Sequence, residues 1–112
     1  MKSALRKRLA VAATSLVMLA LPVTSVFADD GPDLFKSKCA MCHGPDGAGK
    51  TTMGEKLKIP DLNSADVQKK TDAELKTIIV KGKNKMPAYE TKLTKEQIDN
   101  LVACIRNRAK KH

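Results

Sequence analysis

The sequence has 112 residues, of which 42% are apolar, 29% are charged and 3% are aromatic. A chain of this length holds one small domain, so a large multi-domain enzyme is excluded. The formal net charge is +9, from 21 basic and 12 acidic residues, but four of the basic residues lie within the first eight positions. The rest of the chain is therefore only moderately basic, and the N-terminal cluster needs its own explanation.

Residues 1–28 have the pattern of a cleaved secretory signal peptide. The basic cluster is followed by the 13-residue apolar run Leu9–Leu21, and Val26 and Ala28 are small enough for a signal peptidase that cuts after Ala28. The apolar run is shorter than the roughly 20 residues that span a bilayer, so an uncleaved membrane anchor is the weaker alternative. Cleavage leaves the domain 29–112, which we expect to be exported to the periplasm.

The domain 29–112 has 84 residues, with 17 basic and 12 acidic residues, a net charge of +5, and two aromatic residues, Phe35 and Tyr89. A chain this short buries a small share of its surface when it folds. We therefore expect a cofactor, a metal or a disulfide to add to its core.

The segment Cys39–His43 reads C-A-M-C-H, which is the pattern of covalent haem attachment. Residues three apart share one face of a helical turn, so the sulfur atoms of Cys39 and Cys42 can form thioether bonds to neighbouring vinyl groups of one porphyrin. The adjacent His43 then lies where an imidazole nitrogen can bind the iron. The predicted cofactor is one haem c, bound through two thioethers.

Other interpretations of this motif fit less well. A thioredoxin-like redox pair needs a preceding strand, and residues 31–38 have no alternating β-branched pattern. A zinc site needs about four ligands, and only Cys104 and His112 remain beyond the motif. A disulfide between the two motif cysteines would close a very small loop and would leave the histidine unexplained.

The apolar periodicity predicts an all-α fold of about four short helices. The first helix begins near Pro32 and runs into the attachment motif. The glycine-rich segment 44–49 ends it, and a loop is expected to continue to about Leu62.

Two further helices are expected in the middle of the chain. Asn63 or Ser64 can cap a short helix that runs through Lys69. The segment Thr71–Glu74 matches a capping box, and it begins a helix that ends at Gly82.

The last helix is predicted by a second capping box, Thr94–Gln97. Leu93 can form a hydrophobic staple with Ile98, which fixes the angle at which the chain enters the helix. Apolar residues then recur at helical spacing and predict a buried stripe, made of Ile98, Leu101, Val102 and Ile105.

These features together resemble the class I cytochromes c, in particular the small single-haem soluble carriers of bacteria. The resemblance covers residues 31–108 and rests on C-x-x-C-H and on further segments in the family's order: Gly31 and Phe35 before the motif, Pro60–Leu62, Gly82–Pro87 and Leu101–Ile105. It implies a helical fold wrapped round one haem, in which the first and last helices cross at a glycine and an aromatic residue.

One position departs from the family's pattern. Cys104 stands where the family usually has Tyr, Trp or Phe packed against the first helix. Buried thiols behave as small hydrophobic groups and react poorly, so we expect a buried Cys104 in a monomer. A disulfide-linked dimer and an exposed free thiol are the alternatives.

The second axial ligand is expected from Met86. A thioether is a soft, neutral ligand for haem iron, and a loop between Gly82 and Pro87 can hold it rigidly. Met53 is the competing candidate, whereas Met41 meets a steric objection because it lies between the anchoring cysteines.

The ring N–H of His43 that does not face the iron needs an acceptor, because such a bond fixes the ring and raises its basicity. The resemblance implies the backbone carbonyl of Pro60 for this role. The alternative is that Pro60 is only a turn residue.

Two protein ligands would fill both axial positions, so the implied function is one-electron transfer without enzymatic catalysis. We predict a periplasmic carrier of the respiratory chain between a quinol-oxidising complex or a dehydrogenase and a terminal oxidase or reductase. It would meet membranes only through its partner complexes. The alternative is a haem enzyme or gas sensor with a labile distal ligand. Nucleic-acid binding is disfavoured because an exported chain with two aromatics lacks a stacking surface.

Lysines flank both parts of the expected site. A basic zone there would steer encounters with redox protein partners that have an acidic docking face. Scattered surface charge is the alternative explanation of the same residues: Lys36, Lys38, Lys50, Lys81, Lys83, Lys85, Lys92 and Lys95.

Overall fold

The computed structural model describes residues 13–20 and 30–111. Residues 13–20 have no regular secondary structure, and the expected cleavage site at Ala28, with most of the expected leader, lies outside the described residues. Across the described ranges, no helix has both the length and the apolar character needed to cross a membrane.

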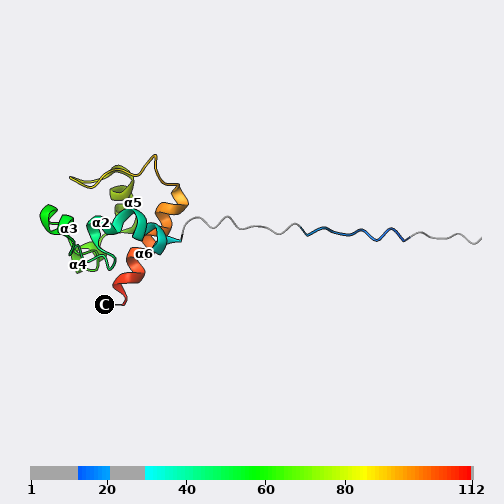
Figure 1. Cartoon of the computed structure of the whole chain (residues 1–112), viewed down its shortest axis with the longest axis horizontal. Coiled ribbons are helices and arrows are strands. Elements are labelled where there is room, and N and C mark those ends of the chain that lie inside the picture. Colours follow the sequence, from blue (N-terminus) through cyan, green and yellow to red (C-terminus); the bar gives the residue numbers. More distant parts are fainter. Residues whose placement is uncertain (1–12, 21–29, 112) are drawn as a thin grey trace, which may run out of the picture.

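The helix that was predicted to run into the attachment motif is present (Figure 1). It consists of α1 (Gly31–Leu34), the π-helical turn η1 (Phe35–Cys39) and α2 (Ala40–His43), which follow one another without a break. The amide of Ala40 donates to the carbonyl of Phe35, five residues earlier. Single π-helical turns are often found at functional sites, and this one leads directly into the attachment motif.

The expected loop to Leu62 is wrong in one respect, because helix α3 (Thr52–Leu57) lies within it. The Thr51 hydroxyl caps this helix by accepting a hydrogen bond from the amide of Gly54 at 2.8 Å. Glycine inside a helix lowers its intrinsic stability. The short helix therefore depends on its cap and its packing, and it leaves little periodic signal in the sequence.

The two middle helices are confirmed as α4 (Ala65–Gln68) and α5 (Asp72–Lys81). Ser64, not Asn63, caps α4, with its side chain accepting from the amide of Val67. The capping box at the start of α5 forms as predicted, with both reciprocal hydrogen bonds between Thr71 and Glu74.

Helix α6 (Lys95–Ala109) is the longest, and its capping box between Thr94 and Gln97 also forms as predicted. Leu93 and Ile98 are both buried at the staple positions. The part of the chain that the structure describes contains no β-strand, only an isolated bridge between Lys83 and Met86. The all-α class is thus confirmed, with five helical segments within residues 30–111 where about four were expected.

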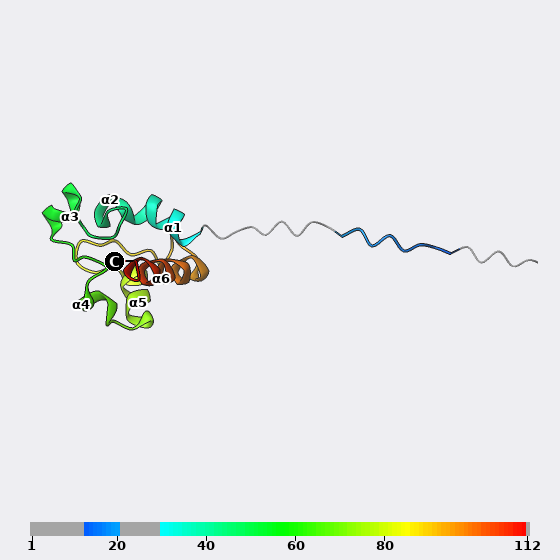
Figure 2. The same ribbon diagram turned by 90° about the horizontal axis from the view of Figure 1, so that it is seen from below.

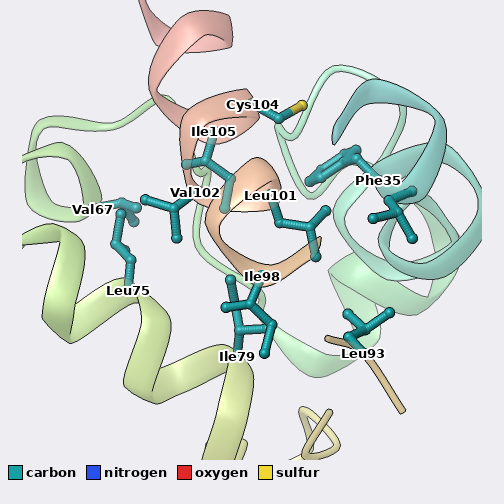
Figure 3. Close-up of a cluster of buried hydrophobic side chains, with 11 residues drawn as sticks. Phe35, Val67, Leu75, Ile79, Leu93, Ile98, Leu101, Val102, Cys104 and Ile105 are labelled. Carbon is teal, nitrogen blue, oxygen red and sulfur yellow. The ribbon is translucent and has the colours of Figure 1, made fainter. Parts of the chain in front are cut away.

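Helix α6 lies at the centre of the fold, between the α1–α2 segment and α5 (Figure 2). Figure 3 shows its apolar stripe in contact with both neighbours: Val67 and Leu75 approach from one side and Phe35 from the other. The core is small, which agrees with a domain that needs a cofactor to complete it. Its members are Leu34, Phe35, Val67, Leu75, Ile79, Leu93, Ile98, Leu101, Val102, Cys104 and Ile105.

The crossing of α1 over α6 depends on Gly31. A Cβ at this position would overlap the backbone carbonyl of Asn100 and would lie 3.2 Å from the Cβ of Cys104. Phe35, one turn later, is only 1% exposed. The expected close crossing at a glycine is therefore present, but the residue opposite Gly31 on α6 is Cys104 and not an aromatic side chain.

Cys104 is buried, as expected, with 5% of its surface exposed. Its sulfur accepts a hydrogen bond from Nε of Arg108 at 3.3 Å. We predict that thiol reagents label Cys104 slowly in the native haem protein, and that non-reducing electrophoresis shows a monomer. Rapid labelling, or a dimer band that reductant removes, would contradict this.

We also predict that Cys104→Ser destabilises the protein by only about 1 kcal/mol, because the hydroxyl keeps Arg108 as a donor. Denaturant unfolding of the haem protein measures this loss. A loss of about 3 kcal/mol would show that Arg108 does not satisfy the new hydroxyl.

Candidate haem-binding site

Cys39 and Cys42 lie half-buried as free thiols at the junction of η1 and α2. The pKa of the Cys39 thiol is raised to about 11, mainly by burial and to a smaller extent by the neighbouring thiols of Cys104 and Cys42, while the Arg108 guanidinium acts in the opposite direction. The Cys39 thiol is therefore uncharged at neutral pH. Both sulfurs sit on a single helical turn, which is the arrangement that the motif predicts.

His43 follows at the end of α2 and is partly buried. Burial lowers the pKa of its ring below the ordinary value, so the imidazole is neutral at neutral pH and keeps a lone pair for a metal. Its ring centroid lies 6.3 Å from that of Phe35, with the planes inclined at 45°. The position and protonation of this ring suit it to bind iron.

The hydrogen bond expected between His43 and the Pro60 carbonyl is not formed in this structure. Nδ1 of His43 is buried and has no hydrogen-bond partner. The Pro60 carbonyl lies near Gly49, whose amide donates to the His43 carbonyl at 2.7 Å: a Cβ on Gly49 would meet the Ile59 carbonyl at 2.8 Å and the Pro60 carbonyl at 3.6 Å. A buried ring nitrogen without a partner is rare and needs an acceptor to complete it.

Thr51 fixes the attachment turn, a role that is not among the sequence predictions. Its hydroxyl donates to the Cys42 carbonyl at 2.8 Å while it caps α3. A Cβ at Gly54 would lie 2.5 Å from the same carbonyl, so α3 packs closely on the attachment turn. A threonine at a possible N-cap was the available signal.

Met86 ends a tight turn that follows α5. Lys83 and Met86 exchange two backbone hydrogen bonds, of 3.2 and 2.9 Å. The turn needs Gly82, which has a φ of 74° and whose Cβ would lie 2.6 Å from the Met86 carbonyl. Met86 is partly buried against the core, whereas Met53 and Met41 are 40% and 80% exposed.

Tyr89 connects the Met86 turn to the attachment segment. Its hydroxyl donates to the carbonyl of Lys38 at 3.1 Å, directly before Cys39, and its amide donates to the carbonyl of Ile79 on α5 at 3.0 Å. No sequence pattern indicates this role, although Tyr89 is one of only two aromatic residues in the domain 29–112. It joins the two parts of the candidate site in space.

The residues fit a haem c. Two thiols on one turn can form thioether bonds to the porphyrin, and the possible iron ligands are the neutral imidazole beside them and a thioether on a separate turn. Within the described residues, no three His, Cys, Asp or Glu side chains are grouped to hold a bare metal ion. A small helical fold with such a donor set is the arrangement of a c-type cytochrome.

Comparison with known proteins gives the same class. A family described as "Cytochrome C oxidase, cbb3-type, subunit III" matches residues 27–105. Cytochrome c6 of Synechococcus sp. (strain ATCC 27167 / PCC 6312) is 31% identical over 103 residues, which cover 88% of this chain and 86% of the relative. Cytochrome c6 of Bryopsis maxima is 38% identical over 80 residues, which cover 67% and 84%.

The fold also matches a solved structure, the KustC0563 c-type cytochrome. Its TM-score is 0.66 at 33% identity, and the match covers 70% of this chain and 96% of that one. The chain therefore belongs to the cytochrome c family that its sequence resembles. It is a single-haem electron carrier with covalently bound haem c and redox protein partners, and it is not an enzyme.

Proposed function

We propose that this protein is a periplasmic carrier that moves single electrons between membrane or periplasmic redox proteins of a respiratory chain. Its donor would be a quinol-oxidising complex or a dehydrogenase, and its acceptor a terminal oxidase or reductase. The observation that carries the proposal is the pair of rigidly held elements, the attachment turn and the Met86 turn, joined through Tyr89. When bound, haem c supplies a one-electron couple at this site.

Cys39 and Cys42 hold the cofactor in this proposal. The Thr51 hydroxyl and the close packing of Gly54 against the Cys42 carbonyl keep their turn in place. Covalent attachment on a fixed turn limits movement of the cofactor between oxidation states. Small rearrangement on electron transfer is what a carrier requires.

His43 is the proposed ligand on the attachment side. Its neutral ring offers a nitrogen lone pair, and its buried Nδ1 would donate to the carbonyl of Pro60. The nearness of that carbonyl to Gly49, whose amide binds the His43 backbone, supports this assignment.

Met86 is the proposed second ligand. The turn between Gly82 and Met86 fixes its backbone, and packing against the core partly shields its side chain from water. Bound to the iron, the Met86 thioether would leave no open position for substrate or oxygen and would favour the reduced form. This is what separates a carrier from a haem enzyme or gas sensor.

Residues 1–28 are proposed to be a signal peptide, and 29–112 the exported domain. The basic cluster, the apolar run and the small residue at Ala28 support this. The test is the mass of the haem protein recovered from the periplasm. An N-terminus at Asp29 is expected, and a protein that retains its first 28 residues would contradict the proposal.

The lysines around the Met86 turn are proposed to bind an acidic face on the redox protein partner. Lys83 and Lys85 are exposed and make no ion pair among the described residues, whereas Lys81 pairs with Glu90 at 3.2 Å. Charge on this turn would steer the partner and leave contacts weak enough for turnover. We expect a monomer that reaches membranes only through these partner complexes.

We predict that electron exchange with the membrane partner slows as salt rises, because exposed charges are screened within about 8 Å at physiological ionic strength. Replacing Lys83 and Lys85 with glutamate should slow the low-salt rate severalfold. The matched control is the same replacement of Lys110 and Lys111, which are exposed at the end of α6. Equal losses from the two pairs would favour scattered charge over a docking zone.

A further inference from the structure

Arg108, near the end of α6, contacts three parts of the attachment region. Its guanidinium carbon lies 4.2 Å from the centroid of the Phe35 ring, its Nε donates to the sulfur of Cys104 at 3.3 Å, and its Nη1 donates to the carbonyl of Pro45. A planar guanidinium can stack on an aromatic ring and donate at its edge at the same time, which lysine cannot do. These contacts fix the position of the charge.

The contacts place this charge against the segments on both sides of the attachment motif. Phe35, on which the guanidinium stacks, has its ring centroid 6.3 Å from that of His43. Pro45, whose carbonyl accepts from Arg108, lies two residues after His43. Arg108 therefore connects α6 to both sides of the attachment motif.

Arg106, two residues earlier, shows that arginines on this helix differ in environment. Its Nε pairs with Asp72 at 3.0 Å, and its Nη1 donates to the carbonyl of Gln68 at 2.7 Å. Among the described residues, no carboxylate forms an ion pair with Arg108. The Asp72 carboxylate therefore neutralises the charge of Arg106 on the α4–α5 side. The charge of Arg108, which has no such carboxylate, faces the attachment region.

We propose that Arg108 is a positioning residue that clamps the attachment turn to α6 and holds a permanent positive charge that favours the reduced haem. The inference rests on the proposed attachment and ligation of haem at Cys39, Cys42 and His43. Oxidised haem carries one more positive charge than reduced haem, so a fixed cation nearby raises the free energy of the oxidised state more. Because the side chain is half-exposed, solvent screening keeps the effect modest.

Replacing Arg108 with glutamine should shift the reduction equilibrium toward the oxidised form by about threefold, which is about 28 mV for a one-electron couple. Arg108→Met is a second neutral variant in case glutamine impairs folding, and it should shift the equilibrium in the same direction. Arg108→Lys retains the charge, so the reduction potential of this variant should stay near that of the parent. Lysine cannot keep both the ring stacking and the bond to the Cys104 sulfur, so thiol reagents should label Cys104 faster. The matched control is Arg106→Gln.

Potentiometric titration of the purified haem proteins, beside thiol labelling, tests this proposal. We expect both neutral Arg108 variants to have lower potentials, and Arg106→Gln to be destabilised with its potential unchanged. Neutral variants with the parent potential, or an equal shift in Arg106→Gln, would overturn the electrostatic role. The absorption spectrum of each protein is recorded first. A parent protein without attached, methionine-ligated haem would overturn the proposed function itself. Normal spectra with unshifted potentials would overturn only the role of Arg108.

Discussion

Replacing both Cys39 and Cys42 with alanine should give a chain that carries no covalent haem and has lost most of its helical structure. Among the residues that the structure describes, the apolar core has eleven buried members, and Phe35 is the one aromatic residue in it. A ligand that binds only the folded state stabilises it through linkage, and a small domain without that contribution falls below the stability it needs. We expect the apo chain to be largely unfolded.

Circular dichroism of the double variant measures this directly, with the protein expressed with and without the haem-maturation machinery. Cys104→Ala is the matched control, since it removes a buried thiol that takes no part in attachment. It should retain its haem and its helicity. A helical, haem-free double variant would show that the described core is sufficient for folding by itself.

Replacing Met86 with alanine should open the second axial position. We expect the variant to lose the sulfur-to-iron charge-transfer band and to have a lower reduction potential. Cyanide should bind at least about tenfold faster, because it no longer has to displace the Met86 sulfur. A tenfold faster rate requires an activation free energy that is lower by only about 1.4 kcal/mol. Optical titration of the oxidised protein measures the band and the rate of cyanide binding together.

Met53→Ala is the control for the Met86 variant. Met53 is 40% exposed on α3 and makes no contribution to the buried core. Its replacement should leave the band, the potential and the cyanide rate unchanged. If the two variants behave in the opposite way, Met53 is the ligand and the role proposed for the Gly82–Met86 turn is wrong.

The parts of the fold that the sequence predicted are those with local signals. The two capping boxes at Thr71 and Thr94 each involve residues three apart, and the structure contains both. The apolar stripe of α6 is likewise visible in the sequence, because burial follows helical spacing. Helix α3 was missed because its cap at Thr51 is followed by Gly54, a poor helix former whose placement depends on packing against Cys42.

The candidate site was predictable only in part for a similar reason. The attachment motif is contiguous, so Cys39, Cys42 and His43 could be named from the sequence. The bonds from Tyr89 to Lys38 and from Arg108 to Pro45 join residues 51 and 63 positions apart. Such contacts depend on how the helices pack. A tyrosine or an arginine in the sequence does not show which distant backbone carbonyl it will bind.

Cys104 shows how packing resolves an ambiguity that the sequence leaves open. The sequence allowed a buried thiol, a dimer or an exposed group. The structure places the Cβ of Cys104 at the helix crossing, 3.2 Å from where a Cβ on Gly31 would lie, and its sulfur within hydrogen-bonding distance of Arg108. The guanidinium stacks on Phe35 next to this thiol, at the crossing where the family usually has a larger aromatic side chain.

The absorption spectrum of the purified protein, oxidised and then reduced, tests the central claim most directly. The protein would be exported with the haem-attachment machinery and denatured once to show that the haem stays on the chain. We predict covalently retained haem, a sulfur-to-iron charge-transfer band in the oxidised form, and a reduced spectrum that added ligands leave unchanged on mixing. Haem lost on denaturation, or a reduced form that binds added ligand at once, would contradict a carrier with its haem attached at Cys39 and Cys42 and ligated by His43 and Met86.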